Sequence, residues 1–86
     1  MANHKNKQEA FQAAQQGTEQ VVDAYSLVEK DSADYGSQLK HVRQELNEAI
    51  QQIGNALEVA SEHQRMQLMQ YMDHLQGIMS EINAEG

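Results

Sequence analysis

Apolar side chains recur every three or four residues along most of the chain. A helix advances by about 100° per residue, so side chains with this spacing lie on one of its faces. In the first part of the chain, the residues that share an arc of about 120° are Phe11, Ala14, Thr18, Val21, Val22, Tyr25 and Val28. We therefore expect an amphipathic helix over about residues 5–30, with a polar N-terminal tail. Ala10, Gly17 and Ala24 border the apolar arc, and we predict that a second helix approaches closely along this edge because these residues are small.

A polar stretch separates this segment from the next apolar face. Between Lys30 and Ser37, Asp and Ser side chains compete with the helix for backbone hydrogen bonds, and Gly36 adds backbone freedom. The first helix is therefore expected to end in this stretch. Ser32, Asp34 and Ser37 are alternative N-caps of the helix that follows.

The second and third helices are expected over about residues 37–59 and 62–83. The apolar arc of the second helix comprises Leu39, Val42, Leu46, Ala49, Ile50, Ile53, Ala56, Leu57 and Ala60. The arc of the third comprises Leu68, Tyr71, Met72, Leu75, Ile78, Met79 and Ile82. Within this arc, Leu68, Leu75 and Ile82 recur at the heptad spacing that is typical of a coiled-coil seam.

The junction between the second and third helices allows two interpretations. Ser61 and Gln64 have the spacing of a capping box, which favours a new helix starting at this point. Against that, no Gly or Pro marks the junction, and the two apolar arcs are offset by only about 30°, so one helix over residues 37–83 would keep a single stripe. We favour the break, which predicts an all-α fold, an antiparallel helical hairpin or three-helix bundle formed by residues 1–86 as one domain. The continuous helix predicts instead a long-helix dimeric coiled coil.

The composition narrows the classes of partner. Lys and Arg number 6 against 13 Asp and Glu, which gives a formal net charge of −7. Because nucleic-acid affinity comes largely from Lys and Arg, and because anionic membrane surfaces repel an acidic chain, we expect neither nucleic acid nor membrane as a partner. No run approaches the roughly 20 apolar residues of a membrane span, and no signal-peptide core follows the polar N-terminus. We expect a cytoplasmic protein, in agreement with the absence of cysteine.

Patterns that would support catalysis or metal binding are weak. His41 and Glu45 stand one helical turn apart, but two ligands are too few for a tight zinc site. The sequence has no HExxH zinc-protease helix, no Gly-rich phosphate loop and no nucleophile elbow. We therefore expect no enzyme activity and no catalytic residue, and we infer no metal, cofactor or small-molecule substrate.

Several large apolar side chains fall outside the three stripes. They are Leu27, Val59, Met66 and Met69. Flexible Met side chains on an exposed helix face recur at adaptable binding surfaces, so we predict these residues as partner-binding residues. Met72 and Met79, in contrast, belong to the third apolar arc and are predicted to lie in the core.

Two stretches carry resemblances to known families. The junction Ala-Ser-Glu-His-Gln-Arg-Met-Gln-Leu at residues 60–68, within the Gln-, Leu- and Met-rich stretch 44–82, resembles the short uncharacterised YtzC-like proteins of Bacillus and relatives. This resemblance implies a bacterial, cytoplasmic, helical protein. The stretch Arg-Gln-Glu-Leu-Asn at residues 43–47 is similar to the SQELD helix of the Spo0E-type aspartyl-phosphate phosphatases. Asn47 stands at the position of that family's catalytic Asp, which puts the activity in doubt.

We expect a small acidic helical interaction protein that either self-associates, for example as a homodimer, or docks a protein partner through apolar helix stripes. One alternative is an inhibitor or regulator that binds one enzyme or transcription factor, with acidic residues meeting a basic surface. A second alternative, from a different class, is a Spo0E-like phosphatase activity centred on His41, Glu45 and Asn47.

Overall fold

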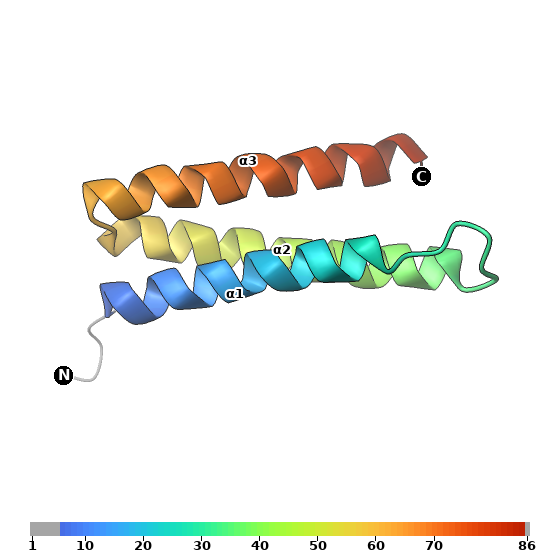
Figure 1. The fold of residues 1–86 in the computed structure, drawn as a ribbon, viewed down its shortest axis with the longest axis horizontal. Helices are drawn as coiled ribbons and strands as arrows, with labels where there is room; N and C mark the ends of the chain where they lie inside the picture. Colours follow the sequence, from blue (N-terminus) through green and yellow to red (C-terminus); the bar gives the residue numbers. More distant parts are fainter. Residues whose placement is uncertain (1–5, 86) are drawn as a thin grey trace.

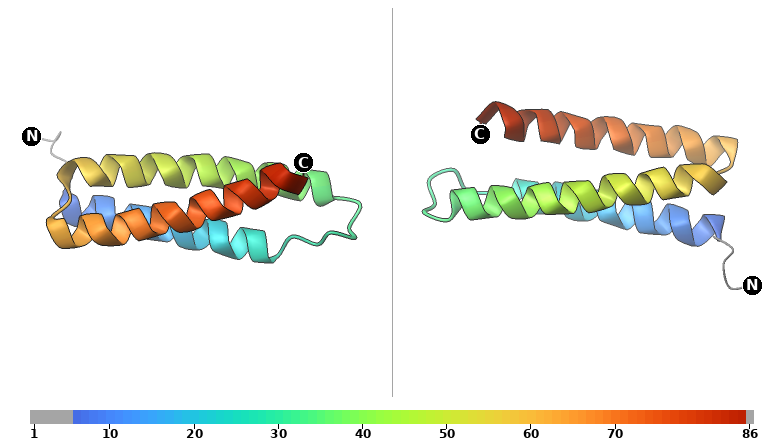
Figure 2. Two further views of the ribbon diagram at one scale, coloured as in Figure 1. Left: turned by 90° about the horizontal axis from the view of Figure 1, so that it is seen from above. Right: turned by 180° about the vertical axis from the view of Figure 1, so that it is seen from behind.

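The computed structural model describes residues 6–85, which form three helices: α1 (Lys7–Ser26), α2 (Tyr35–Val59) and α3 (Glu62–Glu85). α1 and α2 run antiparallel and side by side, and α3 returns along them (Figure 1). Seen from above, α3 crosses the α1–α2 pair obliquely (Figure 2). No strand occurs in the described range, so the predicted all-α three-helix bundle is confirmed. The predicted polar tail at residues 1–5 lies outside the described residues.

α1 is shorter at its C-terminal end than the apolar pattern predicts. The helix starts after Asn6, whose side-chain Oδ1 accepts hydrogen bonds from the backbone N–H groups of Gln8 (2.8 Å) and Glu9 (3.2 Å). It ends at Ser26 rather than near residue 30, so the predicted bound is wrong. The Ser26 hydroxyl donates to the backbone carbonyl of Asp23 at 2.8 Å, which fits the tendency of Ser to compete with helix bonding.

The connection between α1 and α2 is held partly by a side chain from α2. The backbone N–H of Glu29 donates to Oε1 of Gln38 at 3.0 Å, and the N–H of Asp34 donates to the Ser32 hydroxyl at 3.0 Å. α2 begins at Tyr35, slightly earlier than predicted. Asp34 occupies the N-cap position, but its side chain makes no capping hydrogen bond.

A capping box separates α2 from α3. The N–H of Ser61 donates to Oε1 of Gln64 at 3.2 Å, and the N–H of Gln64 donates to the Ser61 hydroxyl at 3.3 Å. Ala60 is extended (φ −74°, ψ 146°), and the Arg65 guanidinium donates to the backbone carbonyl of Leu57 at 2.9 Å. The predicted break is confirmed, and the alternative of one continuous helix is wrong for this structure.

α1 and α2 approach closely at Gly17. A Cβ on Gly17 would lie 3.4 Å from the Cβ of Ala49 and would collide with the side-chain oxygen of Gln52. α1 and α2 are thus within direct contact distance at Gly17, where a Cβ would need only a shift of the flexible Gln52 side chain. The predicted close approach along this edge is confirmed.

The same register determines which residues of α1 and α2 face each other one heptad to either side. Because the helices are antiparallel, Ala10 lies opposite Ala56 and Ala24 lies opposite Val42 when Gly17 lies opposite Ala49. Ala24 and Val42 line one groove, as this register requires. α1 and α2 thus form a tight hairpin, on which α3 rests.

The three apolar stripes meet in one core. Its buried members are Ala14, Val21, Val42, Leu46, Ala49, Ile53, Ala56, Leu68, Leu75, Ile78 and Ile82. Met72 and Met79 pack against this core and are partly buried, as predicted. Thr18 is also buried, and its hydroxyl donates to the backbone carbonyl of Ala14 at 2.8 Å, which satisfies the polar group within α1. Among the described residues, no helix is both long enough and apolar enough to cross a membrane.

Candidate functional site

The large apolar side chains that fall outside the stripes are mostly exposed. Leu27 is 75% exposed, Met66 66% and Met69 60%, and no other large hydrophobic side chain in the described range is as exposed. Val59 is half-buried. Their role in binding a partner stays a prediction, but their exposure leaves them available for contact.

These residues do not form one surface. Leu27 follows the last residue of α1, beside the α1–α2 connection, whereas Met66 and Met69 lie in the first turns of α3. The α1–α2 connection and the α2–α3 turn lie at opposite ends of a bundle 48 Å long (Figure 1). Val59 ends α2 and shares the turn end with the two Met residues. A single partner-facing patch containing Leu27 together with these residues is therefore absent.

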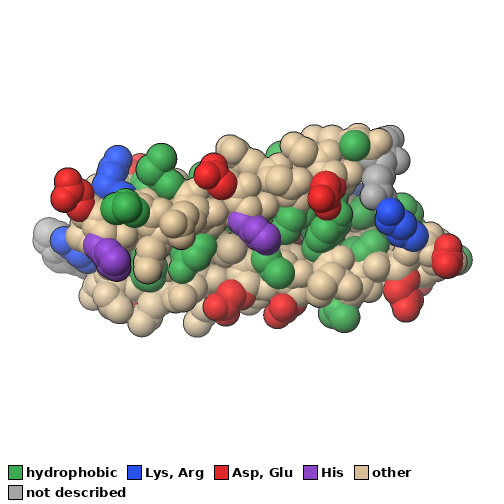
Figure 3. Space-filling view, turned by 45° about the horizontal axis from the view of Figure 1, so that its top comes forward, with side chains coloured by type: hydrophobic (Ala, Val, Ile, Leu, Met, Phe, Trp, Pro, Cys, Tyr) green, Lys and Arg blue, Asp and Glu red, His purple; other side chains and the backbone are tan. Residues whose placement is uncertain are grey.

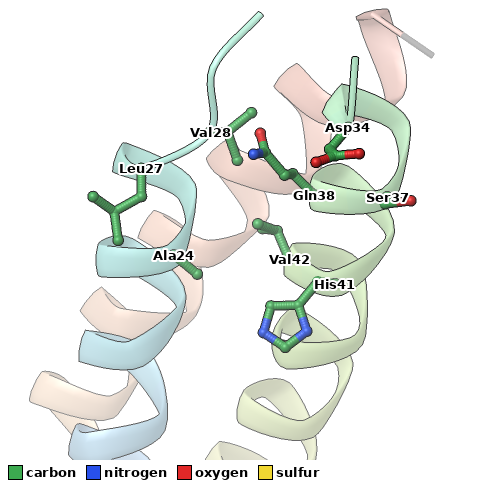
Figure 4. A pocket seen from close by; sticks show the side chains of 8 residues that line it. All are labelled: Ala24, Leu27, Val28, Asp34, Ser37, Gln38, His41 and Val42. Atoms are coloured by element: carbon green, nitrogen blue, oxygen red, sulfur yellow. The ribbon is translucent and has the colours of Figure 1, made fainter. Parts of the chain in front are cut away.

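Leu27 stands beside an open groove between α1 and α2. This Leu27 groove has a volume of about 490 Å³ and is lined by Ala24, Leu27, Val28, Asp34, Ser37, Gln38, His41 and Val42. Figure 4 shows Gln38 reaching from α2 toward Val28, with α3 behind the two helices. The groove therefore opens on the side of the hairpin that α3 does not cover.

The local sequence explains how the groove forms. α1 stops at Ser26, so the chain turns away from α2 instead of continuing beside it. Ala24 is too small to fill the space opposite Val42. Gln38 holds the departing chain by accepting the hydrogen bond from the N–H of Glu29. Ala24, Val28 and Val42 thus give the groove an apolar floor. The end of α1 at Ser26 forms its edge.

The charged groups at the edge of the groove are mainly acidic. Asp34 lines it, and Glu45 lies one turn along α2, where its carboxylate is 3.6 Å from Nε2 of His41. No Lys or Arg lines the groove. Its edge therefore favours positive charge on whatever occupies it.

A second groove lies between α1 and α3. It is lined by Val22, Tyr25, Ser26, Asp73, His74, Gly77, Ile78 and Glu81. The Tyr25 hydroxyl donates to the Glu81 carboxylate at 2.5 Å and bridges the two helices. Figure 3 shows hydrophobic side chains reaching the surface along this junction. The hydrogen bond ties α1 to α3 beside this groove.

The residues of the phosphatase alternative do not converge. His41 and Glu45 are adjacent on α2, but Asn47 lines a separate hollow with Arg43 and Gln44. Over the residues that the structure describes, no three or more His, Asp or Glu side chains gather as a metal site.

Most of the groove's lining escaped prediction. Of its residues, only Leu27 was predicted to bind a partner, on the basis of its position outside the stripe. Gln38, Ser37 and Val42 carry no sequence signal for a site, because they meet α1 only through the register of the hairpin.

Comparison with protein families, with curated proteins and with solved structures gave no match to this chain. The resemblance to YtzC-like proteins therefore stays a prediction. The candidate site is therefore supported by the geometry of this chain alone.

Proposed function

We propose that this chain is an interaction protein that docks a helical segment of a protein partner in the Leu27 groove. The observation that supports the proposal is that the most exposed large apolar side chain, Leu27, borders an open apolar hollow. Burying such a side chain and hollow against a partner removes apolar surface from water, which favours binding by about 25 cal/mol per Å².

The acidic residues near the Leu27 groove favour a partner segment that carries positive charge. Asp34 and Glu45 lie near the groove, no Lys or Arg lines it, and the chain has a net charge of −7. A basic amphipathic helix would place apolar side chains over Val28 and Val42 and its Lys or Arg side chains near these carboxylates. A second copy of this acidic chain is a poorer occupant, because it would bring like charges together.

An enzyme or a transcription factor that carries such a segment would be regulated by this docking. The alternative of an inhibitor or regulator thus uses the same groove. A bacterial and cytoplasmic setting is part of the proposal and rests on the resemblance to YtzC-like proteins.

Titration with an amphipathic helical peptide of Leu and Lys, followed by amide NMR shifts, tests the proposal. We expect the largest shifts at the residues that line the Leu27 groove. Leu27→Gln should weaken binding by about 10-fold or more, because an apolar contact worth about 1.5–3 kcal/mol is lost. Met66→Gln is the matched control, since it removes a similarly exposed side chain elsewhere, and it should leave the affinity unchanged. Shifts centred on Met66 and Met69, or equal affinities of the two variants, would contradict the docking site.

A further inference from the structure

Only two residues separate α2 from α3, and neither requires a bend. Ala60 is a strong helix former, Ser61 costs a helix interior only about 0.5 kcal/mol relative to Ala, and the chain has no Pro. The described residues include no positive φ angle. The bend at Ala60 is held by the Ser61–Gln64 capping box and by the Arg65 bond to the Leu57 carbonyl.

If α2 and α3 formed one straight helix, the backbone N–H groups at the junction would still have hydrogen-bond partners. In a continuous helix, the N–H groups of residues 61–64 would donate to the carbonyl groups of residues 57–60. These bonds would replace those of the capping box. Local hydrogen bonding thus differs little between the bent and the straight chain, and the packing of α3 decides between them.

The apolar faces of α2 and α3 would also line up. In a straight helix the buried residues of α2 and those of α3 would lie on neighbouring parts of one face, with an offset of about 45° at 100° per residue. These residues are Val42, Leu46, Ala49, Ile53 and Ala56 in α2 and Leu68, Leu75, Ile78 and Ile82 in α3. A straight helix over residues 35–85 would therefore carry these apolar side chains along one side, interrupted near the junction by the polar Gln64. Its α3 half would be uncovered in a single chain.

We propose that two copies of this chain exchange α3, so that α3 of each copy packs on the α1–α2 hairpin of the other. The occupant is a second copy because only an identical α3 restores the same contacts. These include the Phe11–Tyr71 ring contact, with centroids 6.2 Å apart, and the Tyr25–Glu81 hydrogen bond. Short connections between packed elements favour such exchange. This interaction uses the face under α3 and is independent of the Leu27 groove.

One charge pair opposes the straight form. Glu58 and Glu62 would stand at i and i+4 in a continuous helix, where like charges destabilise it. In the bent chain, Glu62 lies in the first turn of α3, where a negative charge is favourable. Glu62 therefore biases the chain toward the bent, monomeric form.

Glu62→Pro should prevent the exchange. Position 62 is the first residue of α3, where Pro is well tolerated, whereas in the interior of a straight helix Pro removes a hydrogen bond and clashes with the preceding turn. We expect the dissociation constant of the dimer to rise at least about 100-fold. Lys7→Pro is the matched control, because Lys7 is the first residue of α1 and lies away from the turn. It should leave the dimer unchanged.

Glu62→Lys should promote the exchange. It converts the Glu58 pair into an attractive one in the straight helix and removes a favourable charge from the start of α3. We expect a dissociation constant a few-fold to about 10-fold lower. The double variant Ser61→Ala/Gln64→Ala, which removes the capping box, should shift the equilibrium in the same direction. Circular dichroism of each variant checks that it remains folded.

The measurement is light scattering with size-exclusion chromatography after refolding at a series of chain concentrations. For fluorescence energy transfer, chains that carry a donor dye at Gln44→Cys are mixed before refolding with chains that carry an acceptor dye at Ala84→Cys. These positions adjoin the Arg43–Asn83 contact between α2 and α3. We expect dimers with efficient energy transfer between chains. Three results would overturn the proposal. The first is that both the wild type and the Glu62→Lys variant stay monomeric at every concentration. The others are dimers without energy transfer and dimers that persist in Glu62→Pro.

Discussion

Two glycines in the middle of helices have different surroundings. Gly17 faces Ala49 across the α1–α2 interface, whereas nothing lies within 4 Å of the place where a Cβ on Gly54 would stand. Both cost helix stability relative to other residues, by about 1 kcal/mol against Ala. Of the two, only Gly17 lies against another helix, so only there would a large side chain meet a neighbouring helix.

Gly17→Leu should lower the free energy of unfolding by about 1–3 kcal/mol, because the new side chain would force α1 away from α2. Gly54→Leu is the matched control and should be neutral or stabilising, since Leu favours the helix more than Gly does. Urea unfolding followed by circular dichroism measures both. Equal effects of the two substitutions would show that α1 and α2 do not pack closely at Gly17.

At the scale of the elements, side chains set the start of α1 and of α3. Asn6 accepts two backbone hydrogen bonds at the start of α1, and Ser61 and Gln64 form reciprocal bonds at the start of α3. α2 starts without such a bond from Asp34. α1 and α3 thus have local start signals, whereas α2 begins where the connection from α1 is anchored by Gln38.

Asn6→Ala should reduce the free energy of unfolding by about 1 kcal/mol, because it removes the N-cap of α1. Asn55→Ala, at an exposed position inside α2, should leave stability unchanged or raise it by a few tenths of a kcal/mol. Chemical unfolding of both variants makes the comparison. A loss at Asn55 as large as that at Asn6 would argue against a capping role.

At the scale of the whole molecule, three helices cover a core that none could bury alone. Leu46 and Ile53 from α2 and Leu68, Leu75 and Ile82 from α3 are its largest fully buried side chains together with two valines. Proteins have a stability of only about 5–15 kcal/mol, and chains of this size lie at the low end of what a core supports. Single core contacts therefore weigh heavily.

Leu75→Ala should destabilise the bundle by about 2–5 kcal/mol, because it opens a cavity between α3 and the hairpin. Leu27→Ala removes the same atoms from a side chain that is 75% exposed, and its effect should stay within about 0.5 kcal/mol. Thermal unfolding compares the two. Similar losses at both positions would mean that Leu27 is buried in solution, for example by self-association.

The sequence by itself determined the features that depend on neighbours along the chain. The period of the apolar residues predicts the three helices and their buried faces, because side chains three and four positions apart share a face. The spacing of Ser61 and Gln64 predicts the break between α2 and α3 through a local pair of hydrogen bonds. Leu27, Met66 and Met69 fall outside the stripes, and the structure leaves them exposed.

Only the tertiary structure decided the features that depend on register between helices. The apolar pattern continues to Val28, yet α1 ends at Ser26, and Gln38 of α2 binds the chain beyond it. The same connection places Leu27 at the opposite end of the bundle from Met66, although both looked alike in the sequence. The Leu27 groove exists because Ala24 meets Val42 across two antiparallel helices. Helix periodicity fixes which face is buried but not which residue of another helix lies opposite, and that pairing forms the groove.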